Sequence, residues 1–188
     1  MRLKEPRVNP LPESEWNEEQ KDILEYYRRP SGKVYNIFLT QARHSEMMKK
    51  WRPFSGYILN QSTLPARDRE MLILRIGWLC QSEYEFGQHT RIGQKAGLTS
   101  QEIVNITKGP DAPGWDPFDA ALLRAVDELH ADAFISDATW NTLSKRYNEK
   151  QMIDLIMTVG NYNMVSMFLN TVGVQLDPKL VGFPDTRV

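Results

Sequence analysis

The segment SEYEFGQH, residues 82–89, spaces three polar side chains at intervals of three and four. On a helix such residues are neighbours along one face, so Ser82, Glu85 and His89 would lie within reach of one another. A carboxylate beside an imidazole is a common acid–base unit, because it orients the ring and raises its pKa. A further carboxylate, Glu70, lies in the preceding apolar segment and needs a partner if that segment is buried. The segment could therefore carry an acid–base unit, a metal site or only a capped helix start.

The same residues also have structural interpretations. Ser82 and Glu85 have the S-x-x-E spacing of a capping box, in which the serine caps a helix and the glutamate returns to the backbone N–H of the serine. As a bare pattern this is the commoner use of the spacing, although Ser82 could also bind substrate. His89 could be a satisfied histidine of the surface or core, and Glu70 could pair with a neighbouring arginine.

A metal site is a further alternative, because Glu85 and His89 are spaced like two ligands on one helix face. A structural zinc site normally takes four ligands, and a catalytic site takes three and a water. Neither His44 nor His130 has a sequence spacing that would make it a third ligand beside Glu85 and His89. We therefore expect no metal site.

Helices must position these residues, because apolar residues recur with helical period through most of the chain. No strand-like alternation with hairpin signals occurs, so we predict an all-α fold of about eight helices. A helix that ends near Gly97 carries the motif. The segment 65–80 before it is dense enough in apolar residues to be nearly buried. Pro53 is expected to break or kink the helical segment 35–60.

The chain divides into three parts. Residues 1–34 are a proline-rich arm and a first helix, residues 35–177 are the helical domain, and residues 178–188 are an irregular tail. A chain of 188 residues is long enough for one domain with an added arm.

Charge and cysteine content exclude several classes of protein. The chain has 23 basic and 24 acidic side chains without a basic run, so we expect no nucleic-acid partner. The apolar run 71–80 contains an arginine and is too short for a membrane span, so we expect no membrane partner. No apolar segment of a secretory signal is visible, and the single Cys80 forms no intramolecular disulfide, which fits a cytoplasmic protein.

Glu70, eleven further residues and then S-x-x-E-x-x-x-H resemble the signature of the carboxymuconolactone decarboxylase and alkylhydroperoxidase D (AhpD-like) superfamily. In its peroxidase branch a glutamate is followed, after eleven residues, by C-x-x-C-x-x-x-H. The segments LPARDREMLILRIGWLCQSEYEFGQHTRIGQKAGLTSQEI and NYNMVSMFLNTVGVQLD are similar to the central helical pair of the family and to the closing helix of its decarboxylase-like members. The resemblance implies an AhpD-like domain over residues 35–177 that forms a homo-oligomer, either a trimer, a dimer or a hexamer.

The sequence departs from the peroxidase signature at both thiol positions, which hold Ser82 and Glu85. Thiol–disulfide exchange needs an attacking and a resolving thiol, so the lone Cys80 argues against peroxidase activity. The remaining E-x-x-x-H element, Glu85 to His89, is similar to the corresponding element of the decarboxylase branch. It implies cofactor-free chemistry on a small organic acid or lactone in aromatic catabolism, by a carbon–carbon lyase, decarboxylase or isomerase. With this resemblance we expect His89 to be a general acid or base, Glu85 to orient it or share its proton, and Glu70 to be a second acid or proton relay. The alternative is a non-catalytic oligomeric member of the fold, with a structural or ligand-binding role.

Residues outside the motif are candidates for contact with a small-molecule substrate. Tyr162 and Asn163 interrupt the apolar closing helix, where a buried polar group needs a partner. Phe54 belongs to a set of aromatic residues that could form the apolar wall of a pocket. The other members are Tyr35, Phe38, Trp51 and Tyr57. Packing within the core is the alternative for all of them.

The closing helix, residues 151–174, is also a candidate for an intersubunit face. It carries Met152, Met157, Met164 and Met167. Methionine serves both in cores and at adaptable interfaces, so core packing is the alternative.

Overall fold

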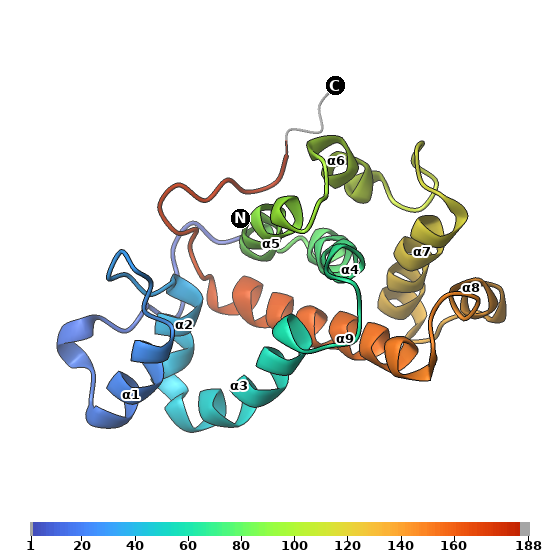
Figure 1. The fold of residues 1–188 in the computed structure, drawn as a ribbon. Coiled ribbons are helices and arrows are strands. Elements are labelled where there is room, and N and C mark those ends of the chain that lie inside the picture. The colour runs from blue at the N-terminus through green and yellow to red at the C-terminus, as the bar shows by residue number, and fades with distance from the viewer. Residues whose placement is uncertain (1, 185–188) are drawn as a thin grey trace.

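The computed structural model describes residues 2–184, and within that range the chain is built from helices alone, as the sequence predicts (Figure 1). Nine α-helices and two short 3-10 helices occur in this part of the chain, where about eight helices were expected. In chain order they are η1 (Glu13–Glu15), α1 (Glu18–Tyr26), α2 (Asn36–Gln41), η2 (Ala42–His44), α3 (Ser45–Asn60), α4 (Ala66–Leu79), α5 (Glu83–Lys95), α6 (Ser100–Lys108), α7 (Pro117–Asp132), α8 (Asp137–Leu143) and α9 (Glu149–Val172).

The break expected at Pro53 is wrong, because this proline lies inside the continuous helix α3. The alternative, a kink at Pro53, stays a prediction. The helical segment 35–60 is divided earlier, at η2. A proline removes the backbone bond to the carbonyl four residues before it. Here that carbonyl belongs to Lys49, an exposed residue, so water can satisfy it and the helix continues.

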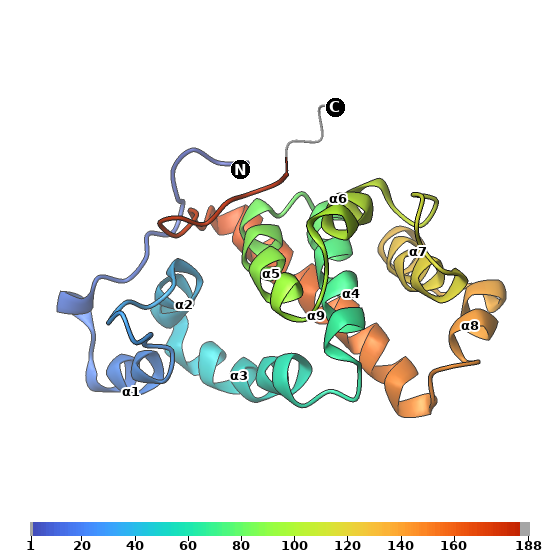
Figure 2. The ribbon, with the colours of Figure 1, turned by 45° about the horizontal axis from the view of Figure 1, so that its top comes forward.

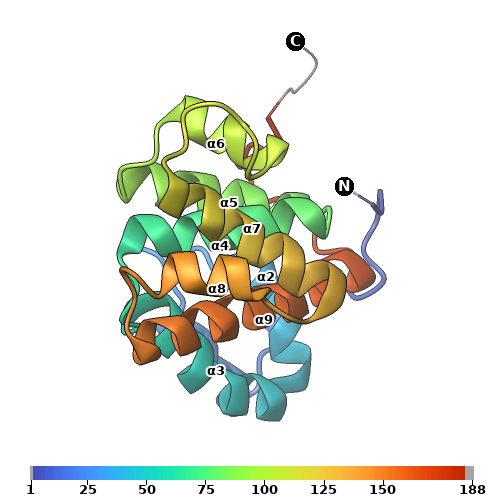
Figure 3. The ribbon, with the colours of Figure 1, turned by 90° about the vertical axis from the view of Figure 1, so that its right-hand side faces the viewer.

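Helix α4 is the centre of the fold. Its residues 70–77 are all buried, which confirms the prediction of a nearly buried helix. It packs against α5, α6, α7 and α9, and in Figure 3 it lies between α5 and α9. Buried charges on such a helix must be paired. Arg75, for example, donates to Asp127 at 2.6 Å and to two backbone carbonyls of α6.

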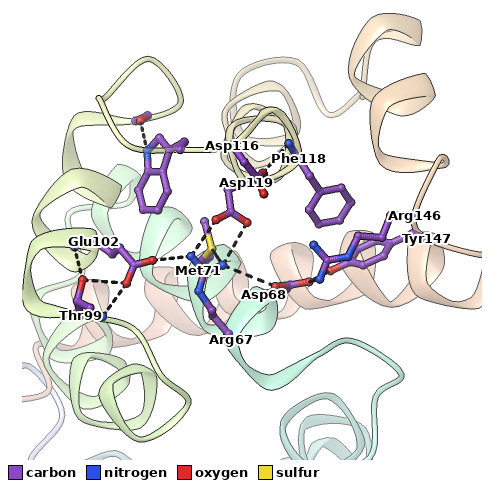
Figure 4. Close-up of polar contacts among 12 residues, drawn as sticks. Arg67, Asp68, Met71, Thr99, Glu102, Asp116, Phe118, Asp119, Arg146 and Tyr147 are labelled. Carbon is purple, nitrogen blue, oxygen red and sulfur yellow. Dashed lines mark hydrogen bonds and ion pairs between the residues drawn. The ribbon is translucent and has the colours of Figure 1, made fainter.

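Ion pairs and a hydrogen bond connect the first turn of α4 to the neighbouring segments (Figure 4). Arg67 donates to Asp119 on α7 at 2.8 Å and to Glu102 on α6 at 2.6 Å. Asp68 accepts a hydrogen bond from the hydroxyl of Tyr147, just after α8, at 2.6 Å. Charged partners make hydrogen bonds stronger than neutral ones, so these contacts fix where α4 begins.

The N-terminal helices form a second, smaller cluster, at the end of the molecule opposite to α7 and α8 (Figure 1). Its buried members are Leu11, Trp16, Ile23, Leu24, Ala42 and Met48. The arm before α1 returns along the end of α9, where the Arg7 N–H donates to the Val172 carbonyl at 2.8 Å. Residues 2–34 therefore pack onto their own chain and build a wall beside α3. The division of the chain at residues 34 and 177 stays a prediction.

Helix α9 is the longest helix, with 24 residues. Its length and composition alone would allow it to cross a membrane, whereas the sequence analysis found no apolar run of sufficient length. Its apolar composition has another explanation in this fold, because 56% of its most apolar window is buried. It packs against α3, α4, α5 and α7, and Figure 2 shows it passing behind α4 and α5.

Candidate active site

The structure brings together Glu70 on α4 with Glu85 and His89 on α5. His89 Nδ1 lies 2.6 Å from Glu70 Oε2, and His89 Nε2 lies 2.9 Å from Glu85 Oε1. The exposed fractions of the three side chains are 0% for Glu70, 5% for Glu85 and 6% for His89. The imidazole is therefore held between two buried carboxylates, with both ring nitrogens engaged.

The close approach of α4 and α5 at Gly93 makes this arrangement possible. A Cβ atom at Gly93 would lie 2.9 Å from the Leu98 side chain, 3.4 Å from that of Leu74 and 3.6 Å from Glu70 Cβ. A larger residue would push the helices apart, because a packed interior does not absorb extra volume. Gly93, four residues after His89, thus sets the separation at which His89 reaches Glu70.

Arg69, Glu70, His89 and Glu85 form a row in which positive and negative side chains alternate. Its guanidinium lies 3.0 Å from Glu70 Oε1, so Glu70 contacts both Arg69 and His89. Burial on its own lowers the pKa of His89, but the carboxylates of Glu70 and Glu85 outweigh it and raise this pKa to about 10. His89 is therefore protonated at neutral pH, and its two N–H groups donate to the two carboxylates.

A cavity of about 470 Å³ opens beside these groups, between α3 and the N-terminal helices on one side and α5 and α9 on the other. Glu85 and His89 line this cavity, whereas Glu70 does not. Tyr162 lines it too, and its ring meets the imidazole edge-on with 4.8 Å between the centroids. Burial and the two carboxylates raise the pKa of Tyr162 well above its usual value, so the phenol stays neutral.

Aromatic side chains form much of the remaining wall. They are Tyr26, Tyr27, Tyr35, Phe38, Trp51, Tyr57 and Tyr84. The contribution of Tyr26 and Tyr27 has no signal in the sequence, because it depends on how α1 folds back against α3. Arg52 also lines the cavity, with its guanidinium 4.3 Å from the Tyr26 ring centroid, and supplies a positive charge there.

Two of the predicted substrate-binding residues outside the motif do not line the cavity. Phe54 packs against the main hydrophobic core, and Asn163 accepts a hydrogen bond from the Cys80 thiol at 3.0 Å. Asn161 and Tyr162 line the cavity, because they lie on another side of α9. No spacing in the sequence distinguishes Asn161 from Asn163, so only the rotation of the packed helix selects between them.

The histidine has no ring nitrogen left for a metal ion in this arrangement, because both contact carboxylates. Within residues 2–184 no group of three or more histidine, cysteine or acidic side chains is arranged to hold a metal ion.

The family model of the carboxymuconolactone decarboxylase family matches residues 45–128, the segment that contains Glu70, Glu85 and His89. A solved structure described as an alkylhydroperoxidase AhpD core, an uncharacterized peroxidase-related protein from Ralstonia eutropha JMP134, shares the fold. The TM-score is 0.79 at 16% identity, over 92% of this chain and 93% of that one. Residues 45–128 therefore resemble the carboxymuconolactone decarboxylase family, and the chain has an AhpD-like fold.

Other members of this fold are similarly distant in sequence. An uncharacterized peroxidase-related protein from Silicibacter sp. TM1040 has a TM-score of 0.76 at 18% identity, over 95% of this chain and 92% of that one. The debrominase Bmp8, solved with 2,3,4-tribromopyrrole, has a TM-score of 0.76 at 11% identity, over 93% and 94% of the two chains. The comparison with curated proteins gives no match.

Within this AhpD-like fold, the two positions of the peroxidase thiols have separate surroundings. Ser82 stands at the N-cap position of α5, fully buried, but its side chain makes no capping bond and does not line the cavity. Its backbone N–H donates to the Gly77 carbonyl at 2.8 Å, so it is not available to Glu85. Glu85 contacts His89 instead. The capping-box interpretation is therefore wrong, and a contact between Ser82 and substrate has no support.

Proposed function

We propose that the protein is a cofactor-free acid–base enzyme of the carbon–carbon lyase type, a decarboxylase or isomerase. Its substrate would be a small organic acid or lactone from aromatic catabolism. The observation that carries this proposal is the buried His89 between Glu70 and Glu85, on the wall of a cavity. Buried titratable groups with shifted pKa values beside a cavity are typical of active sites. A purely structural role would not require two carboxylates on one imidazole.

The geometry suggests separate tasks for the two groups that line the cavity. Glu85 presents a carboxylate and can accept a proton from a substrate carbon or hydroxyl. His89, protonated at neutral pH, can return a proton to carbon after decarboxylation or to a new position during isomerisation. Glu70 lies outside the cavity lining and stabilises the imidazolium, with its own charge offset by Arg69.

The cavity walls support an unsaturated or aromatic ring as the substrate framework. Aromatic side chains enclose most of the space, and Arg52 can offset the charge of a carboxylate. The debrominase of the same fold was solved with a flat heterocycle, 2,3,4-tribromopyrrole, which supports a ring-shaped ligand for a protein of this fold. Peroxide reduction is not proposed, because Cys80 is the only thiol in the sequence.

The proposal is tested by proton exchange at carbon, which reports acid–base chemistry whichever bond is finally broken. Unsaturated lactones and keto acids are incubated with the protein in D₂O, and deuterium uptake and carbon dioxide release are followed. Glu85→Gln and His89→Asn should each reduce the rate by about 10²–10⁴-fold, the usual contribution of a positioned acid or base. His130→Asn changes an exposed histidine and should have no effect. Equal rates in Glu85→Gln and wild type would show that the chemistry does not use this site.

We also propose that the protein is a cytoplasmic homo-oligomer that assembles through α9. Ile153, Met157, Met164 and Met167 are between 44% and 59% exposed along this helix. Apolar residues grouped on one surface are typical of protein–protein contacts. Met152 was expected on the same face, but it is 2% exposed and belongs to the core.

A further inference from the structure

One residue that lines the cavity carries a buried polar atom without a hydrogen-bond partner. Several buried side-chain atoms within residues 2–184 have no hydrogen-bond partner, and Asn161 Nδ2 is the only one of them that belongs to a cavity-lining residue. Asn161 is 4% exposed, so bulk water does not readily satisfy this amide. Buried polar groups are almost always hydrogen-bonded, so this amide next to a cavity is a donor that a bound molecule can pair with.

Trp51 fixes the orientation of this amide. Its indole Nε1 lies 3.1 Å from Asn161 Oδ1. An indole N–H can only donate, so the oxygen of the asparagine must face Trp51 and the two N–H groups of Nδ2 must face elsewhere. The side chain is thus a hydrogen-bond donor held in one orientation.

The neighbours of Asn161 connect this donor to the acid–base groups. Tyr162, the next residue on α9, contacts the His89 ring, and all three residues line the same cavity as Glu85. A ligand oxygen bound by Asn161 therefore shares this cavity with the base. When Glu85 removes a proton from the carbon next to a carbonyl group, the electrons of the C–H bond move onto the carbonyl oxygen. A hydrogen-bond donor at that oxygen stabilises the enolate that forms.

We propose that Asn161 binds the carbonyl or carboxylate oxygen of the substrate through Nδ2, and that Trp51 is the positioning residue that holds its amide. The proposal deepens the proposed function and rests on it for the role of that oxygen in the reaction. The class of ligand is an α,β-unsaturated lactone or acid whose carbonyl group is conjugated with its ring or chain.

Binding of two matched small molecules tests this inference. 2(5H)-Furanone and 2,5-dihydrofuran share a five-membered unsaturated ring, and only the furanone has a carbonyl group. Their dissociation constants are measured by NMR titration with wild type and with Asn161→Leu. The preference of wild type for the furanone should fall about three- to tenfold in the variant, because one hydrogen bond is lost. Asn163→Leu is the matched control, since Asn163 does not line the cavity, and it should keep the wild-type preference.

Trp51→Phe tests the positioning role. It keeps the ring and removes the indole N–H, so the preference for the furanone should fall only in part while both ligands still bind. The side-chain amide signal of Asn161 in wild type gives a measurement that needs no variant. It should shift on addition of the furanone and not on addition of 2,5-dihydrofuran.

Three results would overturn the inference: an unchanged preference in Asn161→Leu, an Asn161 amide signal that ignores the furanone, or a wild type that binds neither molecule. Failure of the proposed function would give a different set of results from failure of this inference. Glu85→Gln should still prefer the furanone while it loses proton exchange. A protein that binds the furanone through Asn161 without exchanging protons would contradict the enzymatic proposal alone.

Discussion

Neutralising Glu70 should change how the stability of the protein depends on pH. Glu70→Gln keeps the shape of a fully buried side chain and removes the carboxylate that lies 2.6 Å from His89 Nδ1. The pKa of His89 is raised to about 10 from an ordinary value of 6.5. A raised pKa means that the proton on His89 stabilises the folded chain. This contribution is complete below pH 6.5 and is lost as the pH rises toward 10.

The size of the effect follows from linkage. The interval from 6.5 to about 10 corresponds to about 5 kcal/mol, at about 1.4 kcal/mol per pKa unit. An opposite charge at this distance shifts a pKa by about one to three units. Glu70→Gln should therefore remove about 1–4 kcal/mol of the pH-dependent stability, and the variant should lose little further stability above about pH 9.

Urea unfolding at pH values from 6.5 to 9.5 measures this dependence, with a parallel NMR titration of His89. Asp154→Asn is the matched control, because Asp154 is a buried carboxylate on α9 that accepts hydrogen bonds from Tyr57 and Thr63. This control should be less stable at every pH and keep the wild-type slope. Equal slopes for wild type and Glu70→Gln would refute the coupled arrangement of His89 and its two carboxylates.

Three further predictions concern packing and assembly. Gly87→Ala would place a Cβ atom 2.4 Å from the Val181 carbonyl oxygen and should lower the free energy of unfolding by about 1–3 kcal/mol. Gly56→Ala meets no atom within 4 Å and should raise this free energy by up to about 1 kcal/mol, so equal effects would contradict the packing. Asp119→Asn removes a carboxylate of the α4–α7 ion pair and should cost about 1.5–3 kcal/mol in chemical unfolding. Met164→Glu should dissociate a homo-oligomer in size-exclusion chromatography with light scattering, whereas Met47→Glu on α3 should not; an unchanged mass for Met164→Glu would exclude this face.

The sequence was sufficient for the fold class, because helical periodicity is a local property. It was also sufficient for the approach of Glu85 to His89, which helix geometry alone produces. The contact of Glu70 with His89 depends on the packing of α4 against α5, and only the family spacing indicated it. A local pattern therefore predicts contacts within one helix better than contacts between two.

The misreading of Ser82 has a specific cause. The S-x-x-E pattern assumes that the backbone N–H of the serine is unpaired. In this fold the turn between α4 and α5 passes through Gln81 at a φ of 53°, and the Ser82 N–H reaches the Gly77 carbonyl. The turn thus provides a hydrogen-bond acceptor for the Ser82 N–H. The Glu85 carboxylate is not needed there and contacts His89 instead. The pattern contains no information about the preceding turn.

The proposed acid–base groups and the groups that enclose the cavity come from different stretches of the chain. Glu70, Glu85 and His89 lie within the family segment 45–128, whereas Tyr26 and Tyr27 precede it. Asn161 and Tyr162 follow it on α9. Mutations in the outer stretches can therefore alter which molecule is admitted and leave the proton-transfer groups intact. We therefore expect that exchanging residues 2–34 for those of another protein of this fold would change which molecules bind in the cavity and leave the proposed acid–base groups in place.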